Sequence, residues 1–121
     1  MLDLGAGFSE FINSISANTK YAMNLNPEIL NAAGSEVKIF QQDCSDSWPL
    51  AEAELDVVFT SNFLEHLPNK EAVRRALSNA HHCLKPRGRF IAMGPNIKYI
   101  YAKRLLGFLR SLRRADGVVT V

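Results

Sequence analysis

Few of the residues that mark special classes of protein occur in this chain of 121 residues. Its two cysteines, Cys44 and Cys83, set no disulfide framework and favour a reduced, cytoplasmic protein. No apolar run approaches the roughly 18 residues that a membrane-spanning helix requires. The first residues carry neither the basic flank nor the apolar core of a secretory signal, so we expect no secretion. Internal repeats are also absent. The sequence therefore predicts neither a membrane-spanning, nor a disulfide-stapled, nor a repeat protein.

The composition is that of one ordinary globular domain, with 47% hydrophobic and 21% charged residues. The net charge of +2 hides an asymmetry, because residues 1–72 carry eleven acids against three bases and residues 73–121 carry eleven bases against one acid. Such polarity can indicate a face for nucleic acid or an anionic membrane. The bases do not alternate regularly with aromatic residues, so we favour acidic and basic layers of one domain over a nucleic-acid-binding face.

Short apolar runs alternate with helical periodicity, a pattern that predicts βαβ units and a parallel sheet. Strands are expected over residues 1–4, 20–25, 36–41, 55–60 and 89–93. Helices are expected over residues 9–17, 27–33 and 70–84, and Pro86 and Gly88 are expected to break the chain before the last strand. Residues 115–121 carry no clear element. The predicted fold class is α/β, Rossmann-like, with a mostly parallel sheet of about five strands and flanking helices.

A glycine loop, Gly5-Ala6-Gly7, follows the first predicted strand and precedes the first helix. Glycines let a backbone approach a ligand closely, and the free N–H groups of a following helix favour anionic groups. A dinucleotide fingerprint would have a third glycine at position 10, where this chain has Glu10. The loop therefore suits a nucleoside ligand without a pyrophosphate, and disfavours a nicotinamide-dependent oxidoreductase. A tight structural turn also explains the two glycines taken alone.

Polar residues also end the later predicted strands, at Asn24, at Asp43-Cys44 and at Ser61-Asn62. In an open parallel sheet, ligands lie across these carboxyl ends. Residues 2–7, 22–28, 42–43, 56–67 and 84–86 resemble, in order and spacing, the successive motifs of the class I S-adenosylmethionine-dependent methyltransferases. Residues 56–67, DVVFTSNFLEHL, are similar to a signature of the general and small-molecule branch. The resemblance covers roughly residues 1–95.

The resemblance implies roles for the residues at the first two strand ends. Gly5, Ala6 and Gly7 would cradle the methionine end of S-adenosylmethionine, and Asp3 would hold the loop and the cofactor's amino group. Asn24 stands where the family has an acidic residue that binds the ribose diol. Losing that charged partner should cost about 1–3 kcal/mol of cofactor binding.

At the other strand ends, the resemblance implies that Asp43 accepts a hydrogen bond from the adenine N6 amine and that the Cys44 backbone N–H meets a ring nitrogen. Ser61 and Asn62 would lie beside the sulfonium and the methyl acceptor. The implied reaction is methyl transfer to an unidentified acceptor, with S-adenosylhomocysteine as the product. Such a displacement needs alignment and exclusion of water more than it needs acid–base chemistry.

His66 is the candidate general base, should the acceptor have to lose a proton. A histidine that caps or packs in the strand-to-helix loop is the favoured alternative. Glu65 and His66 alone are too few for a metal site, so no metal is predicted. Cys44 and Cys83 are interpreted as buried small hydrophobes rather than nucleophiles.

Two departures from the family pattern bear on activity. Arg87 stands where the family has glycine, and would be strained if the turn requires a positive φ. The family's usual C-terminal strands are not evident, which indicates a truncated or variant domain. We therefore keep a second hypothesis, a catalytically inactive methyltransferase-like fragment that folds or binds a partner without turnover.

The predicted organisation is a cofactor-binding core over residues 1–96 and a basic amphipathic segment over residues 97–121. In residues 97–114, apolar side chains share one helical face and basic side chains the other. Packing of the apolar face onto the sheet is the favoured interpretation. Contact with an anionic membrane or a protein partner is the alternative.

Overall fold

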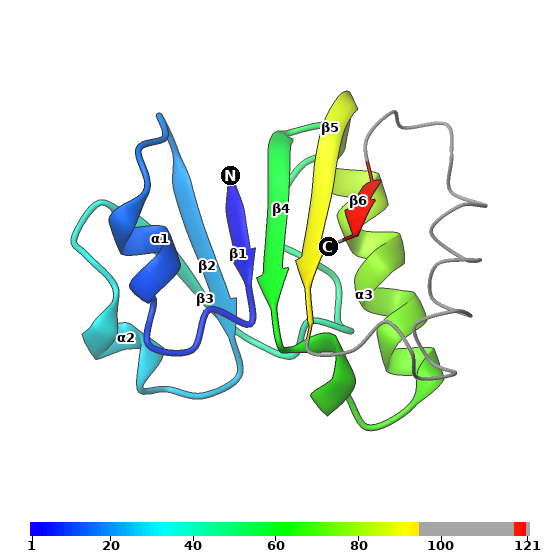
Figure 1. Cartoon of the computed structure of the whole chain (residues 1–121), viewed down its shortest axis with the longest axis horizontal. Coiled ribbons are helices and arrows are strands. Elements are labelled where there is room, and N and C mark those ends of the chain that lie inside the picture. The colour runs from blue at the N-terminus through cyan, green and yellow to red at the C-terminus, as the bar shows by residue number, and fades with distance from the viewer. Residues whose placement is uncertain (95–117, 121) are drawn as a thin grey trace.

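A parallel β-sheet runs through the middle of the molecule (Figure 1). The computed structural model describes residues 1–94 and 118–120. The strands lie in the order β3-β2-β1-β4-β5-β6, and every neighbouring pair is parallel. The strands are β1 (Leu2–Leu4), β2 (Lys20–Asn24), β3 (Val37–Gln41), β4 (Leu55–Ser61), β5 (Leu84–Met93) and β6 (Val118–Thr120). The predicted α/β, Rossmann-like fold class is confirmed.

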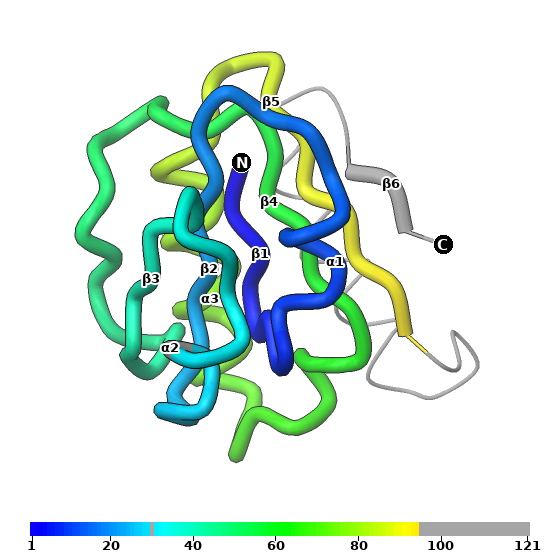
Figure 2. Tube along the Cα trace, turned by 90° about the vertical axis from the view of Figure 1, so that its left-hand side faces the viewer, coloured from blue at the N-terminus to red at the C-terminus, as the bar shows by residue number. Residues whose placement is uncertain are grey.

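Helical segments and loops cover both faces of this sheet. They are α1 (Glu10–Ser14), α2 (Ile29–Ala32), the 3₁₀ turn η1 (Leu64–His66) and α3 (Lys70–Cys83). Seen along the sheet, α1 and the loop of residues 42–54 lie on opposite sides of the strands (Figure 2). The helix α3 begins at the N-cap Asn69, whose side chain accepts a hydrogen bond from the Ala72 backbone N–H at 2.9 Å.

The alternating direction of side chains along a strand divides the apolar residues between two cores. Tyr21 and Met23 of β2 belong to the larger cluster, which includes the buried face of α3. Ala22, between them, belongs to a smaller cluster with Ile12 of α1 and Ile29 of α2. Successive side chains of a strand point to opposite faces, so β2 contributes to both layers.

A buried lysine ties α1 to the sheet. Lys20 is only 7% exposed, and its ammonium donates to the carbonyls of Ile12 and Ile15 at 3.1 Å and to Glu36 Oε1 at 2.9 Å. These three bonds use all three donors of the ammonium, which compensates its burial. They also satisfy carbonyls at the end of α1 and fix that short helix on the sheet.

The first two helices are shorter than the sequence predicts. The structure ends α1 at Ser14 instead of residue 17, because Ile15 is already extended and its carbonyl binds Lys20. The helix α2 is a single turn that begins at Ile29, two residues after the proline predicted to open it. Both helices owe their place to packing and side-chain bonds more than to helix propensity.

The fifth strand is longer than predicted, because it begins at Leu84 directly after α3. Leu55 pairs with Leu84, but the next pair is Val57 with Arg89, so β5 carries extra residues that β4 does not match. The predicted break at Pro86 and Gly88 lies inside this irregularity. Proline cannot donate to a ladder, and sheets place it at such bulges.

The sheet also has a sixth strand that the sequence analysis did not anticipate. Residues 118–120 were expected to carry no clear element, but β6 pairs in parallel with β5, with Phe90 opposite Val118. Its three residues are too short for a periodicity argument. The predicted boundary after residue 96 and the amphipathic segment 97–114 lie outside the described residues. Within the part that is described, no helix is long and apolar enough to span a membrane.

Candidate cofactor site

Backbone hydrogen bonds join the carboxyl ends of neighbouring strands into one continuous edge. They run from Gly5 N to Met23 O at 2.8 Å, from Gln42 N to Asn24 O at 3.2 Å and from Asn62 N to Met93 O at 2.8 Å. The chain winds outward in opposite directions from β1 and β4, so this edge includes the switch point at which open α/β sheets bind ligands. The structure thus brings the predicted site segments to one edge of the sheet.

The glycine loop has a left-handed backbone at both of its glycines. Gly5 has φ +75° and Gly7 has φ +52°. The Gly5 and Ala6 N–H groups both donate to the Met23 carbonyl. The N–H groups of Gly7 and Phe8 have no hydrogen-bond partner within residues 1–94 and 118–120, and a Cβ on Gly7 would meet nothing within 4 Å. The open, donor-bearing part of the loop is therefore its second half.

Asp3, in β1 two residues before this loop, is a buried carboxylate. It is 3% exposed, and burial raises its pKa from the ordinary 3.8 to about 6, although a hydrogen bond with the backbone of Ile12 acts in the opposite direction. The N-cap residue Ser9 makes no side-chain capping bond. Asp3, in β1, therefore interacts with the backbone of α1 at Ile12.

Asn24, at the end of β2, already uses its side-chain oxygen locally. Its Oδ1 accepts a hydrogen bond from the Asn26 backbone N–H at 3.1 Å, which closes an Asx turn. Its Nδ2 has no protein partner among the described residues, so the side chain offers a donor at this strand end. Leu25, the next residue, is 65% exposed and adds apolar surface there.

Asp43 is held as a carboxylate by Ser45. The Ser45 backbone N–H and hydroxyl both donate to Asp43 Oδ1 at 2.8 Å, and these bonds lower the pKa of Asp43 below its usual range. Its Oδ2 takes part in no hydrogen bond with the described residues. One oxygen therefore fixes the side chain, and the other stays available as an acceptor.

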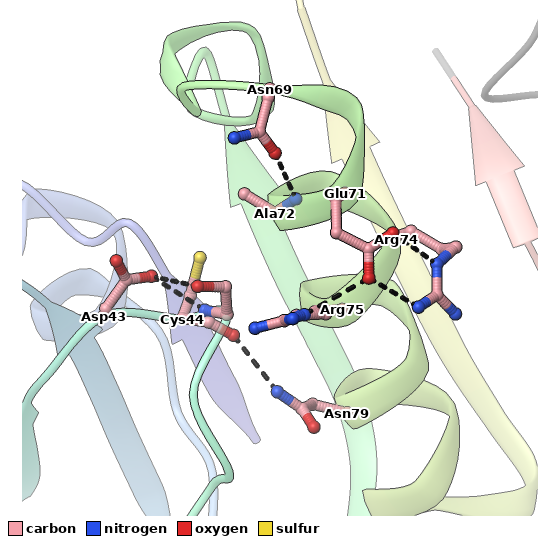
Figure 3. A network of polar contacts seen from close by, with 9 residues as sticks. Asp43, Cys44, Asn69, Glu71, Ala72, Arg74, Arg75 and Asn79 are labelled. Atoms are coloured by element: carbon pink, nitrogen blue, oxygen red, sulfur yellow. Dashed lines mark hydrogen bonds and ion pairs between the residues drawn. The ribbon is translucent and has the colours of Figure 1, made fainter.

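The loop that carries Asp43 is anchored to α3 through the backbone of Cys44 (Figure 3). The Cys44 carbonyl accepts bonds from Trp48 Nε1 at 2.9 Å and Asn79 Nδ2 at 3.2 Å. Asn79 Nδ2 also donates to the Asp46 carbonyl at 2.7 Å. Trp48 and Asn79 were not predicted as site residues, because a side chain's bond to a backbone carbonyl leaves no pattern in the sequence.

We expect Asn79→Ala to lower the free energy of unfolding by about 1–2 kcal/mol, because two bonds to backbone carbonyls, one of them partly buried, are lost. Urea denaturation monitored by the fluorescence of Trp48, which lies in the anchored loop, measures the change. Ser78→Ala, an exposed neighbour on α3, is the matched control. Equal stability of the two variants would show that Asn79 does not anchor the loop.

At the end of β4 the backbone turns sharply at Asn62, which has φ +48°. Asparagine tolerates this left-handed conformation better than most residues. The turn directs the following residue, Phe63, back across the sheet edge, and a Cβ built on Gly5 would fall on the Phe63 ring. Ser61 and Asn62 therefore lie beside the glycine loop, with Phe63 covering part of it.

His66 is exposed and belongs to η1, where its backbone N–H donates to the Phe63 carbonyl at 2.9 Å. Its side chain has no hydrogen-bond partner among the described residues. Its role as general base stays a prediction. Burial raises the pKa of the Cys44 thiol to about 12 and also raises the pKa of Cys83, as expected for structural cysteines. No cluster of potential metal ligands occurs among the residues described.

Arg87 is not strained by its backbone. The non-glycine residues with positive φ in the described ranges are Ser9, Ala53 and Asn62. The Arg87 side chain is exposed. The arginine is therefore compatible with the turn, and its presence does not argue against an intact site.

Comparison with known proteins identifies the family to which this chain belongs. The family described as methyltransferase domain matches residues 2–92. This match covers most of the chain, so the chain belongs to the methyltransferase domain family. A comparison with curated proteins found no match.

Solved structures show the same fold at low sequence identity. A candidate methyltransferase from Bacillus halodurans has a TM-score of 0.69 and 16% identity, over 97% of this chain and 55% of that one. The trans-methyltransferase CalH in complex with SAH has a TM-score of 0.59 and 21% identity, over 96% and 39%. A complex of the Haloferax volcanii Trm112 methyltransferase activator with a candidate methyltransferase has a TM-score of 0.61 and 17% identity, over 74% and 42%. This chain spans about half or less of the length of each.

Proposed function

We propose that this chain binds S-adenosylmethionine at the carboxyl edge of its sheet and serves methyl transfer to an acceptor. The observation that carries the proposal is the arrangement of Asp3, the glycine loop and Asp43 at the carboxyl ends of β1 and β3, on either side of β2, in a methyltransferase domain. The strand order by itself is equally compatible with dinucleotide binding. Glu10 and the family match favour a ligand without a pyrophosphate.

The polar groups at this edge fit the cofactor's functional groups. The free N–H groups of Gly7 and Phe8 would receive the methionine carboxylate, and Gly7 leaves open the space that a Cβ would narrow. Asn24 Nδ2 would donate to a ribose hydroxyl. The free Oδ2 of Asp43 would accept from the adenine amine, and the Cys44 N–H would meet a ring nitrogen.

The bound cofactor would supply a methyl group that its sulfonium has already activated. The protein's own contribution would then be orientation and exclusion of water. Asp3 would hold the glycine loop in register with α1 and face the cofactor's cationic amino group. Ser61 and Asn62, at the end of β4, would border the acceptor. His66 would remove a proton only from an acceptor that must lose one.

A thermal-unfolding series tests the proposal. S-adenosylmethionine or S-adenosylhomocysteine at about 100 times its dissociation constant should add about 2.7 kcal/mol to the folded state. NADH is the control, and we expect it to produce no shift. A shift with NADH alone would assign the edge to a dinucleotide. A cooperative transition that no ligand shifts would favour the alternative hypothesis, an inactive methyltransferase-like fragment.

Asn24→Asp is expected to tighten cofactor binding by about 1–3 kcal/mol, because a carboxylate forms stronger bonds with the ribose hydroxyls than an amide does. The new side chain keeps an oxygen for the Asn26 N–H, so the local turn should survive. Isothermal titration measures the change, and Asn26→Asp is the neighbouring control. Unchanged affinity in Asn24→Asp would contradict the ribose assignment.

We also propose the basic segment 97–114 as a contact for an anionic membrane or a protein partner. Its charge supports this proposal, and the fold relative from Haloferax volcanii was solved with a protein partner. Co-sedimentation with anionic vesicles at low and high salt tests the membrane contact. Absence of salt-sensitive binding would remove the membrane alternative.

A further inference from the structure

The Phe63 ring covers the first glycine of the loop. A Cβ on Gly5 would overlap three carbons of that ring, so no side chain other than hydrogen fits at Gly5 while Phe63 keeps its place. Phe63 is half-buried and packs against the larger core. The ring thus contacts both the larger core and the first glycine of the loop, and the residue is not fully buried.

The left-handed turn at Asn62 makes this arrangement possible. Asn62 directly follows β4, its N–H donates to the Met93 carbonyl, and its positive φ sends the chain toward β1. The carbonyl of Phe63 then accepts a bond from the His66 N–H, which starts η1. Backbone bonds on both sides of residue 63 therefore fix the direction of its side chain.

The positive charge of the proposed ligand, S-adenosylmethionine, can interact with the Phe63 ring. A sulfonium is a cation that cannot donate a hydrogen bond, so polar acceptors alone satisfy it poorly. The face of an aromatic ring attracts such a cation. The carboxylate closest in sequence to the loop, Asp3, is buried, and the proposed function pairs it with the cofactor's amino group rather than with the sulfonium.

We propose that Phe63 is a specificity-determining residue, whose ring stabilises the cationic sulfonium and so favours S-adenosylmethionine over neutral S-adenosylhomocysteine. This inference rests on the proposed function, since it assumes that the loop of residues 5–7 receives the methionine end. It concerns the discrimination between the charged cofactor and its neutral product. A ring with this preference would assist product release after transfer.

The experiment compares two dissociation constants in each variant by isothermal titration. Phe63→Leu keeps an apolar side chain and removes the ring, and should weaken binding of S-adenosylmethionine by about two- to thirty-fold, the range of cation–π contributions. Binding of S-adenosylhomocysteine should change by less than about twofold, because it lacks the charge. Phe63→Tyr keeps the ring. It should retain the wild-type ratio, which is the dissociation constant of S-adenosylhomocysteine divided by that of S-adenosylmethionine.

Phe40→Leu is the matched control, because Phe40 is also half-buried against the larger core but stacks on Tyr21 at the β3 side. It should leave the ratio of the two constants unchanged. If Phe63→Leu does not unfold cooperatively, pentafluorophenylalanine at position 63 replaces it. That ring keeps nearly the same shape with a reversed charge distribution, and should lower the ratio in the same direction.

The outcomes separate the two proposals. If the wild-type chain binds neither ligand, the proposed function fails and this inference fails with it. If the wild-type chain binds both and the ratio is the same in Phe63→Leu, the cofactor assignment stands and the role of Phe63 is wrong. A fall in the ratio that Phe63→Tyr also shows would assign the effect to packing and overturn the cation–π role.

Discussion

Asp3→Asn is expected to stabilise the ligand-free protein by up to about 3 kcal/mol at pH 7.5 and to weaken cofactor binding at the same pH. The pKa of Asp3 is about 6 in the folded protein, above its ordinary value of 3.8. The folded state therefore holds a proton that the unfolded state releases between these two values. Stability from this group is greatest below pH 4, falls as the pH rises toward 6, and stays low above it.

Asparagine cannot ionise, so the stability that Asp3→Asn gains over the wild type should be near zero at pH 4 and should increase as the pH rises through 6. Its amide oxygen can still accept the Ile12 bond. Thermal unfolding of both proteins from pH 4 to pH 8 measures the difference. Asp56→Asn is the control, and it should lower stability at neutral pH. The bond from Lys85 lowers the pKa of the exposed Asp56, so the Asp56 carboxylate stabilises the folded state at that pH. A pH-independent effect of Asp3→Asn would contradict the raised pKa.

The same substitution should weaken S-adenosylmethionine binding at pH 7.5 by about 10- to 150-fold, the value of a hydrogen bond to a charged group. Wild-type affinity should rise as the pH increases through 6, and the affinity of Asp3→Asn should stay flat. This part of the prediction depends on the contact with the amino group. A stabilised variant with wild-type affinity would limit Asp3 to holding the loop.

Gly7→Val is expected to abolish measurable cofactor binding, with a loss of at least about 100-fold. A β-branched side chain would crowd the two free N–H groups at Gly7 and Phe8, and two bonds to a carboxylate contribute about 3–6 kcal/mol together. Helical content should remain nearly unchanged, because a Cβ at Gly7 meets nothing within 4 Å. Titration calorimetry and circular dichroism measure the two properties.

Backbone strain has to be separated from this steric effect. Gly7 has φ +52°, where valine is strained whatever the space around it. Ala53 has nearly the same conformation, φ +54°, in an exposed position of the loop before β4. Ala53→Val thus places valine in the same conformation outside the proposed site and should lower stability without affecting affinity. Equal affinity in Gly7→Val and the wild type would show that the loop is only a turn.

The sequence predicts the fold well where hydrophobic pattern and turn chemistry agree. The buried β-branched run of β4 and the periodic helix α3 were both expected within a residue or two of their observed bounds. The strand-end residues could be placed together because parallel strands share one carboxyl edge. The short elements were less predictable, since α2 and β6 owe their existence to neighbours distant in sequence.

Details of the site depend on such distant contacts. The sequence gives no indication that the Gly5 and Ala6 N–H groups are bonded to Met23, or that Asn24 turns its oxygen to its own chain. Likewise, the sequence pattern indicates for Phe63 nothing more than an ordinary core residue next to Leu64. Its contact with Gly5 follows only from the left-handed turn at Asn62, which the sequence pattern does not reveal.

The central position of β1 also has a consequence for how the protein folds. This strand pairs on one side with β2 and on the other with β4, where Leu2 is opposite Val58. One of its partners is therefore nearby in the chain, and the other is more than fifty residues away. The conformational entropy of closing the loop between such distant strands is lost before most of their contacts form, which slows folding of parallel sheets. We expect β1–β3 to form a transient half-sheet whose exposed β1 edge is a site for aggregation until β4 docks.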